Sequence, residues 1–279
     1  MNEATEADWK LLTDLLEERF GLNFSGARQE ILGARLRPRL EALHLDGLRE
    51  YYHYLCFHPG REEELAELTR RITNNETYFF REAAQFDAIV RHVLPESAHI
   101  MRERPLRILS AACSSGEEPY SLSVRLVDSG SEFMGARWEI DACDLNPDRL
   151  ECARRAVYEG FAFRNCDEET RRRCFQEVEP GRFLLRERYR RAVRFFHANL
   201  AAPFVGTGWG SYDVILCRNV LIYFAADGFD RLISRFAQLL RPGGYLFLGH
   251  SESLFDRGAD FEPAYFPDSM AYRRIRCPA

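Results

Sequence analysis

Residues 106–121 constrain the fold of this chain more than any other segment. The apolar run 106–112 is typical of a buried strand, and it stops at a loop of small residues that contains Gly116. Glu117-Glu118-Pro119 then opens a segment with the composition of a helix start. A strand, a loop with little side-chain bulk and a helix, in this order, let a ligand lie close to the backbone. The segment therefore predicts a nucleotide-type ligand site beside Gly116.

The charge that follows this loop narrows the choice of ligand. Glu117 and Glu118 are the wrong sign for a phosphate cradle and suit a cationic ligand with free hydroxyls. S-adenosylmethionine is a ligand of that kind. Asp144 ends the next strand candidate, where doubly wound folds usually place the acidic residue that holds ribose hydroxyls. The alternative role for Asp144 is to cap the helix that begins near Pro147.

The second part of the chain alternates between strand and helix patterns. Strand candidates cover 106–112, 137–143, 193–196, 212–217 and 244–249, and helical stretches cover 118–129, 147–157 and 228–240. This alternation predicts a Rossmann-like α/β fold, with a doubly wound, mostly parallel sheet covered on both faces. Residues 161–196 break the pattern and predict a small antiparallel β-subdomain. Residues 241–244 read as a tight turn from helix into strand.

The first part of the chain reads as helical throughout, so we expect a small all-α domain over residues 1–72 and a second domain over 73–279. Gly21 is a natural stop for the first helix, and Ser25 is a plausible cap for the second. Pro38 is expected to kink or end that second helix. Two further helices are expected over 46–57 and 62–72.

Composition excludes several classes of function. A net charge of −5 and a pI near 5.9 argue against nucleic-acid binding. The chain has no run of 18 apolar residues and its N-terminus is acidic, which argues against a membrane span and a signal peptide. Eight cysteines without a Cys-x-x-Cys pair argue against a zinc site and suit a reducing cytosol. We therefore expect a cytoplasmic monomer without a metal.

Several motifs, in their order along the chain, resemble those of bacterial chemotaxis receptor methyltransferases of the CheR type. They cover residues 73–82, 114–121, 144, 197–200, 217–224, 240–244 and 249–254. The pairing of Phe-Phe-Arg-Glu at 79–82 with Cys-Arg-Asn-Val at 217–220 is the most specific part of the match. The resemblance spans nearly the whole chain. It implies methyl transfer from S-adenosylmethionine to receptor glutamates, which yields glutamate methyl esters and S-adenosylhomocysteine, and an N-terminal domain that contacts the receptor.

The resemblance also implies roles for individual residues. Asn75, Thr77 and Arg81 match residues that line the methionine end of the cofactor. Glu117 matches an acid that contacts the cofactor, and Asp144 matches the ribose-binding acid. The segments that match those beside the adenine and the sulfonium are Asn199-Leu200 and Asn219-Val220. Arg81 and Tyr223 match the pair proposed to stand beside the transferred methyl group.

Each of these residues also has a plainer interpretation from its local sequence. Asn75 is a candidate helix cap, Arg81 a partner for Glu82 or Asp87, and Tyr223 a buried tyrosine bonded to a carbonyl. Asn199 and Asn219 read equally as loop and turn residues. Phe79 and Phe80 are expected to be core residues that anchor the segment.

The implied reaction needs little acid–base help, because a glutamate carboxylate is already ionised near neutral pH. Attack on a sulfonium methyl cancels two opposite charges, so alignment and removal of water are the enzyme's main contributions. A tight arginine clamp would weaken the nucleophile. We therefore expect Arg81 to orient one carboxylate oxygen or to guide approach, and Tyr223 to shape the methyl channel.

Three arginines of the second predicted helix suggest a surface that binds the receptor. Arg28, Arg35 and Arg39 lie within about 40° of one another on a helical wheel, and such a stripe suits an acidic receptor surface. The alternative is a solvated arginine face, since Lys10 is the only lysine in the chain. The short turn at 179–182 argues against binding of a receptor tail peptide. Two other functions remain open: a methyltransferase for another substrate, and a non-catalytic receptor-docking or cofactor-sensing module.

Overall fold

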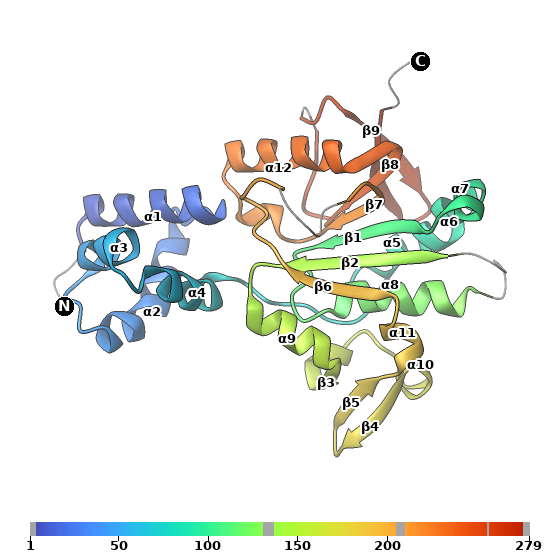
Figure 1. Cartoon of the computed structure of the whole chain (residues 1–279), viewed down its shortest axis with the longest axis horizontal. Helices are drawn as coiled ribbons and strands as arrows, with labels where there is room; N and C mark the ends of the chain where they lie inside the picture. The colour runs from blue at the N-terminus through green and yellow to red at the C-terminus, as the bar shows by residue number, and fades with distance from the viewer. Residues whose placement is uncertain (1–3, 131–136, 205–209, 256, 276–279) are drawn as a thin grey trace.

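The computed structural model describes residues 4–130, 137–204, 210–255 and 257–275. A bundle of helices comes first in the chain and lies at one end of the molecule. A seven-stranded sheet with helices on both faces follows it, and a small three-stranded sheet projects from one side (Figure 1). This is the predicted mostly parallel α/β fold with an all-α segment ahead of it. No helix in the described ranges is long and apolar enough to cross a membrane.

The bundle consists of α1 (Glu6–Phe20), α2 (Ala27–Ala42), α3 (Leu48–Phe57) and α4 (Arg61–Ile72). Thr5 and Asp8 form a capping box at the start of α1, and Gly21 ends it in the left-handed conformation, as predicted. The buried side chains of all four helices form one core, among them those of Leu12, Leu16, Leu32, Leu36, Tyr51 and Leu68.

The prediction of Ser25 as the cap of α2 was wrong, and Pro38 does not end this helix. Its N-cap is Gly26, without a side-chain hydrogen bond, while the Ser25 hydroxyl bonds to the Asn23 side chain instead. The helix also continues through Pro38 to Ala42. Ala34 and Pro38 are both exposed, so solvent can satisfy the carbonyl that the proline leaves without its helical partner.

The main sheet has the strand order β6-β2-β1-β7-β8-β10-β9. Its strands are β1 (Leu106–Ala111), β2 (Trp138–Asp144), β6 (Val193–His197), β7 (Tyr212–Cys217), β8 (Leu240–Leu248), β9 (Phe261–Phe266) and β10 (Ser269–Arg274). The five strands from β6 to β8 in this order are parallel to one another. Strand β10 runs antiparallel to β8 and β9. The sequence analysis missed β9 and β10.

Helices cover both faces of this sheet. One face packs against α8 (Glu117–Asp128) and against the segment that contains α5 (Ala83–Ala88), η1 (Ile89–Val93), α6 (Leu94–Glu96) and α7 (Ala98–Glu103). The other face packs against α12 (Ala226–Leu239). Side chains of β1 alternate between these two cores, since Ile108 belongs to the first and Leu109 to the second.

The predicted turn at residues 241–244 is instead part of β8. Pairing of β7 with β8 shifts register between Tyr212 and Val214, so these four residues bulge within the strand. A Cβ on Gly244 would lie 2.8 Å from the Asp213 carbonyl oxygen, so the bulge needs a glycine at that position.

The predicted β excursion is a three-stranded antiparallel sheet of order β3-β5-β4. The strands of this sheet are β3 (Val157–Glu159), β4 (Phe175–Glu179) and β5 (Arg182–Leu185). Between β3 and β4 lie η2 (Gly160–Phe163) and α10 (Glu168–Cys174), and α11 (Glu187–Arg190) leads back to β6. The ring of Phe79 packs among Tyr158, Phe163 and Phe175 of this small sheet. Phe79 and Phe80 are buried, which confirms their assignment to the core.

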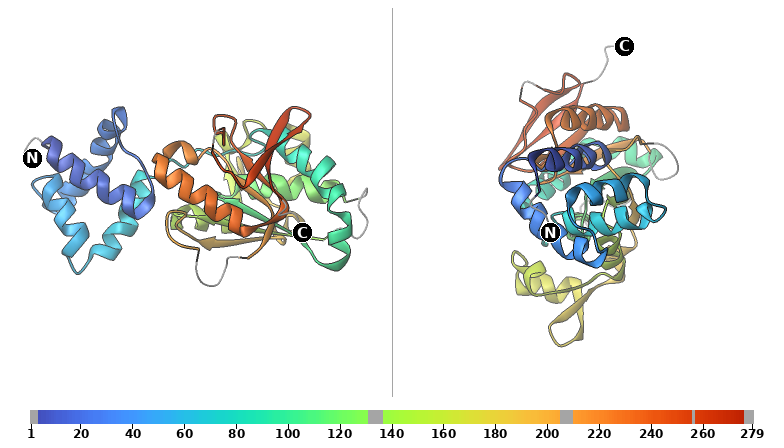
Figure 2. Two further views of the ribbon diagram at one scale, coloured as in Figure 1. Left: turned by 90° about the horizontal axis from the view of Figure 1, so that it is seen from above. Right: turned by 90° about the vertical axis from the view of Figure 1, so that its left-hand side faces the viewer.

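The helical bundle lies at one end of the sheet domain (Figure 2), and hydrogen bonds join it to the loops at the carboxyl ends of the parallel strands. The Asn23 amide donates to the Tyr223 carbonyl at 2.7 Å, and Leu22 and Phe224 form an isolated antiparallel bridge. The Asn199 side chain donates to the Arg19 carbonyl at 2.7 Å. The bundle therefore forms one wall of the space above the sheet edge.

Candidate active site

A cavity of about 290 Å³ lies between the helical bundle and the carboxyl ends of β1, β2 and β7. The bundle contributes Phe20, Leu22, Arg28 and Arg35 to its wall, and the extended segment after α4 contributes residues 73–78 and Arg81. The sheet contributes the loops that follow its strands, at 112–114, 144–145 and 218–220. Open α/β sheets bind ligands at this edge, so the cavity is the candidate site.

Most of the residues predicted from the sequence meet in this cavity. Its wall includes Asn75, Thr77, Arg81, Asp144, Asn199, Leu200, Asn219, Val220 and Tyr223. These residues come from four segments that are far apart in the sequence. Among the predicted cofactor-binding residues, all of which the structure describes, Gly116 and Glu117 are outside the wall.

Gly116 is required by packing beside the cavity rather than by the cavity itself. It is the N-cap of α8 and has φ +91°, a left-handed backbone. A Cβ at this position would lie 2.9 Å from the Ala153 Cβ and 3.2 Å from the Tyr158 hydroxyl oxygen. The glycine thus lets the loop lie against α9 (Pro147–Arg155) and the small sheet.

Glu117 is buried behind the wall, and Glu118 lies in it. Burial raises the pKa of Glu117 to about 7, although hydrogen bonds from Ser115 and Thr77 favour its ionised form. Its carboxylate accepts from the Ser115 hydroxyl at 2.8 Å. Burial also raises the pKa of Glu118, and the charge of Arg218 opposes that rise. Of the two adjacent glutamates, Glu118 and not the predicted Glu117 therefore faces the cavity.

Asp144 joins the loops after β1 and β2. Its carboxylate accepts from the backbone amides of Ser114 and Asn146, both at 2.8 Å. Burial raises its pKa, and these amide hydrogen bonds oppose the change. The helix cap is Asn146, whose side-chain oxygen accepts from the amides of residues 148 and 149. The alternative role of Asp144 as a helix cap was therefore wrong.

The segment before α5 shows how Asn75 and Arg81 are held. The Asn75 side chain donates to the Thr73 carbonyl at 3.3 Å, and α5 begins only at Ala83, so Asn75 is not a helix cap. Arg81 donates to the Glu76 carbonyl at 3.2 Å. Its guanidinium carbon lies 5.6 Å from the centre of the Tyr78 ring, a cation–π contact.

Neither local acid pairs with Arg81 in the ranges that the structure describes. Glu82 forms an ion pair with Arg218 and a hydrogen bond with His250, and Asp87 forms an ion pair with Arg125. The half-buried Tyr223 accepts a hydrogen bond from the Asn74 side chain through its hydroxyl, and its ring lies 5.5 Å from the Arg28 guanidinium carbon. The plainer interpretations of Arg81 and Tyr223 are therefore not what the structure shows.

The three arginines of α2 do not form one free stripe. Arg28 donates to the Ile222 carbonyl at 3.0 Å and Arg35 to the Ile72 carbonyl at 3.2 Å, and both line the cavity. Arg39 forms a 2.6 Å ion pair with Glu64, whose side chain is only 3% exposed. All three lie on α2, but their partners, in α4 for Arg35 and Arg39 and at Ile222 for Arg28, separate their roles.

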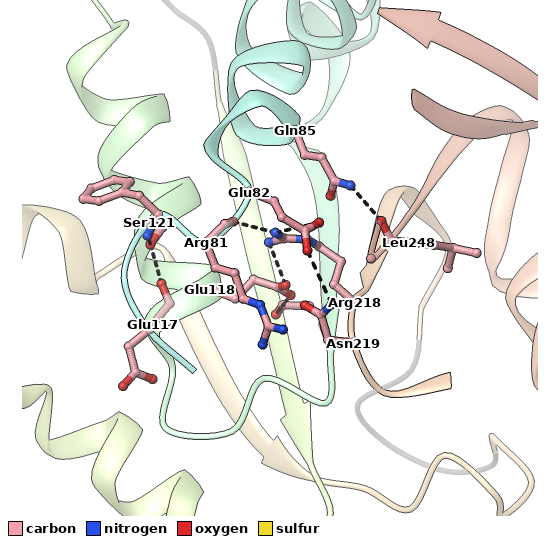
Figure 3. Close-up of polar contacts among 12 residues, drawn as sticks. Arg81, Glu82, Gln85, Glu117, Glu118, Ser121, Arg218, Asn219 and Leu248 are labelled. Atoms are coloured by element: carbon pink, nitrogen blue, oxygen red, sulfur yellow. Dashed lines mark hydrogen bonds and ion pairs between the residues drawn. The ribbon is translucent and has the colours of Figure 1, made fainter. Parts of the chain in front are cut away.

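Sequence reasoning missed two buried charged residues beside the cavity. The Arg218 side chain is 1% exposed and lies between Glu82 and Glu118 (Figure 3). The Glu252 carboxylate accepts from the amides of Asn219 at 2.8 Å, Gly249 at 2.7 Å and residue 222 at 3.3 Å. Both residues lie inside the family motifs at 217–224 and 249–254. A charged residue close to the end of an apolar strand was the signal that could have marked them as site residues.

The chemistry of the wall suits a ligand with a positive group, hydroxyls and a polar tail. Glu118 and Asp144 are carboxylates on the sheet side, and Arg81 is a cation on the opposite segment. In the described residues, no group of three or more His, Cys, Asp or Glu side chains is arranged to hold a metal ion.

Comparison with known proteins identifies the family. The family model described as the SAM binding domain of CheR methyltransferase matches residues 75–268. A second, described as the all-alpha domain of CheR methyltransferase, matches residues 7–73. The chain belongs to the CheR methyltransferase family. The resemblance drawn from the sequence motifs is thus confirmed, and the chain is a methyltransferase that depends on S-adenosylmethionine.

The chain matches two chemotaxis protein methyltransferases over nearly their whole length, and a third relative over part of its length. Chemotaxis protein methyltransferase 2 of Vibrio cholerae is 34% identical, over 98% of this chain and 95% of the relative. Chemotaxis protein methyltransferase 1 of Pseudomonas aeruginosa is 33% identical, over 97% and 98%. The probable biofilm formation methyltransferase WspC of Pseudomonas aeruginosa is 35% identical, over 93% of this chain but 60% of the relative.

Proposed function

We propose that this CheR-type enzyme methylates glutamate side chains of a methyl-accepting chemotaxis-type receptor in the cytoplasm. The products are glutamate 5-O-methyl ester and S-adenosylhomocysteine. One observation carries the proposal: Arg81 and Tyr223 line the same cavity as Asp144, so groups suited to a substrate carboxylate stand beside groups suited to the cofactor. The relatives named chemotaxis protein methyltransferases support the receptor as substrate.

The donor set of the cavity fits S-adenosylmethionine. Asp144, fixed by two backbone amides, would hold the ribose hydroxyls. Asn75 and Thr77 would hold the methionine end, and Asn199 with Leu200 would lie beside the adenine. Glu118 and Asp144 together favour a positively charged ligand over an anionic one. When bound, the cofactor supplies an electrophilic methyl group on a cationic sulfur.

Residues of this chain would align the substrate. One N–H group of Arg81 donates to the Glu76 carbonyl, and the other N–H groups of its guanidinium would orient one oxygen of the glutamate carboxylate. The other oxygen then stays free to act as nucleophile. The Asn74 side chain holds the Tyr223 hydroxyl, so that ring is a fixed side of the methyl channel. Alignment of this kind is worth roughly 7–11 kcal/mol in favourable cases.

Receptor docking would use the mouth of the cavity. Arg28 and Arg35 project from α2 into its wall, where positive charge steers an acidic receptor segment toward Arg81. Arg39 has no place in this proposal, because Glu64 holds it within the bundle. In this division of labour, residues 1–72 contact the receptor and residues 73–279 carry out methyl transfer, with the β-subdomain at about 161–196 as an appendage.

A radiolabelled methyl-transfer assay on receptor-containing membranes tests this function. The proposal predicts base-labile label on the receptor protein, as expected of a glutamyl ester. It also predicts that Arg81→Ala lowers the rate of labelling far more than it lowers affinity for S-adenosylhomocysteine. Base-stable label, or label on a small molecule or nucleic acid, would assign the enzyme to another substrate. No label anywhere, with S-adenosylhomocysteine still bound, would leave only a docking or sensing module.

A further inference from the structure

Arg218 is a deeply buried charged residue in the cavity wall, with 1% of its side chain exposed. It follows β7 and forms ion pairs with Glu82 at 3.3 Å and Glu118 at 3.1 Å, while its second terminal nitrogen also donates to the Arg81 carbonyl. Figure 3 shows these contacts meeting at one guanidinium. The segment before α5, the start of α8 and the loop after β7 are therefore fastened to a single residue.

The backbone that carries Arg81 needs such fastening. Phe80 and Glu82, the residues on either side of Arg81, have φ of +59° and +52°. Left-handed conformations of non-glycine residues are unfavourable and persist only where surrounding contacts hold them. The Phe80 amide donates to the Ser121 hydroxyl at 2.9 Å, and Gln85 donates to the Leu248 carbonyl at 2.7 Å. Between these two contacts, Arg218 holds the Arg81 carbonyl itself.

Outside the cavity wall, Glu82, the partner of Arg218, is held by two further side chains. It accepts from His250 at 3.0 Å and from the Asn219 side chain at 3.4 Å, and it does not belong to the cavity wall. Burial opposes its ionisation, yet the charge of Arg218 and these hydrogen bonds hold its pKa below the usual range. A buried ion pair of this kind often adds little stability over apolar packing, so its position matters more than its energy.

We propose that Arg218 and Glu82 form a positioning pair that sets the Arg81 backbone, and so aims the Arg81 guanidinium at the substrate carboxylate. This inference rests on the proposed function, because it assumes that Arg81 acts on that carboxylate. Arg218 and Glu82 act through Arg81 and not on the methyl group. Loosening the pair would leave the cofactor bound but misdirect the guanidinium.

A double-mutant cycle tests the pair. Glu82→Gln keeps the shape of the side chain and removes the charge that Arg218 meets. In the otherwise native enzyme, this change is expected to lower kcat for receptor methylation about tenfold, with the dissociation constant for S-adenosylhomocysteine changed less than about threefold. In the Arg81→Ala background the same change is expected to lower kcat by less than about twofold, because its target is gone.

Two further variants keep the result interpretable. Arg218→Lys retains one charge but cannot reach two carboxylates and a carbonyl together, so it should repeat the Glu82→Gln pattern even if that variant folds poorly. Arg104→Lys is the matched control, since it weakens a part-buried pair with Asp213 at the opposite end of the sheet and should leave kcat unchanged. Thermal unfolding of each variant reports any general loss of stability.

Three results would overturn the inference. Independent losses of kcat from Glu82→Gln and Arg81→Ala would show that the pair does not act through Arg81. Equal losses of kcat and of S-adenosylhomocysteine affinity would assign it to cofactor binding. A wild-type enzyme that binds S-adenosylhomocysteine but labels no receptor would refute the proposed function, and the positioning role with it.

Discussion

Replacement of Gly116 by alanine is expected to destabilise the protein without reaching the cofactor. The backbone at this residue has φ +91°, and an L-residue in a left-handed conformation costs about 1–2 kcal/mol. The new Cβ would lie 2.9 Å from the Ala153 Cβ, an atom that cannot swing away. Overpacking of this kind costs about 1–3 kcal/mol. The two terms together predict a loss of roughly 2–5 kcal/mol in the free energy of unfolding.

The backbone and packing terms can be separated with a second glycine. Gly181 has φ +77°, and a Cβ there would meet nothing within 4 Å. Gly181→Ala therefore carries the conformational cost alone, about 1–2 kcal/mol. Urea denaturation of both variants gives the difference, which is the packing term at Gly116.

Calorimetry with S-adenosylhomocysteine completes the experiment. Because the added Cβ points toward α9 and the small sheet, the dissociation constant of the folded Gly116→Ala variant should change less than about threefold. Equal stability of the Gly116→Ala and Gly181→Ala variants would refute the packing argument. A large loss of affinity without a loss of stability would show that the glycine serves ligand approach after all.

Three further changes have expected outcomes. Asp144→Asn should weaken S-adenosylhomocysteine binding about 10- to 100-fold in calorimetry, because a neutral amide loses charge-assisted hydrogen bonds to hydroxyls and cannot accept from both backbone amides; an unchanged affinity would exclude the ribose role. Glu117 has a native pKa near 7, above its unfolded value of 4.5, so it favours folding below pH 4.5, and that contribution is lost as pH rises to 7. The stability of wild type relative to Glu117→Gln, from urea denaturation, should therefore fall by up to about 3 kcal/mol across this range, and a flat difference would contradict the burial argument. Arg35→Glu should raise KM for receptor, most strongly at low salt, and leave S-adenosylhomocysteine affinity within about threefold; equal losses of both would refute a docking role.

Local sequence patterns were enough to predict the α/β core. Strands β1 and β7 are short apolar runs flanked by turn or helix signals, and Gly21 ends α1 by standard capping chemistry. Strands β9 and β10 escaped because they mix charged, proline and exposed aromatic residues, such as Tyr265, which is 79% exposed. Pro38 does not end α2 because a helix at the surface tolerates a proline that a buried one would not.

The sequence was enough to predict most residues of the candidate site, but not the contacts that hold them. Residues at the carboxyl ends of strands converge by topology, so Asp144 and Asn219 meet in one cavity. Which of two adjacent glutamates faces the cavity depends on helix rotation, and Glu118 rather than Glu117 does so. The partners of Arg39 and Arg218 come from other segments, and only the folded chain brings Glu64 and Glu82 beside them.

Mass spectrometry of receptor peptides after incubation with this enzyme and S-adenosylmethionine is the most direct test of the account. It predicts the mass gain of one methyl group on glutamate side chains, reversed by mild base and formed far more slowly by Arg81→Ala. Methylation confined to any other residue type, or an unchanged rate of glutamyl ester formation by Arg81→Ala, would contradict the central claim that this cavity aligns a carboxylate with the cofactor.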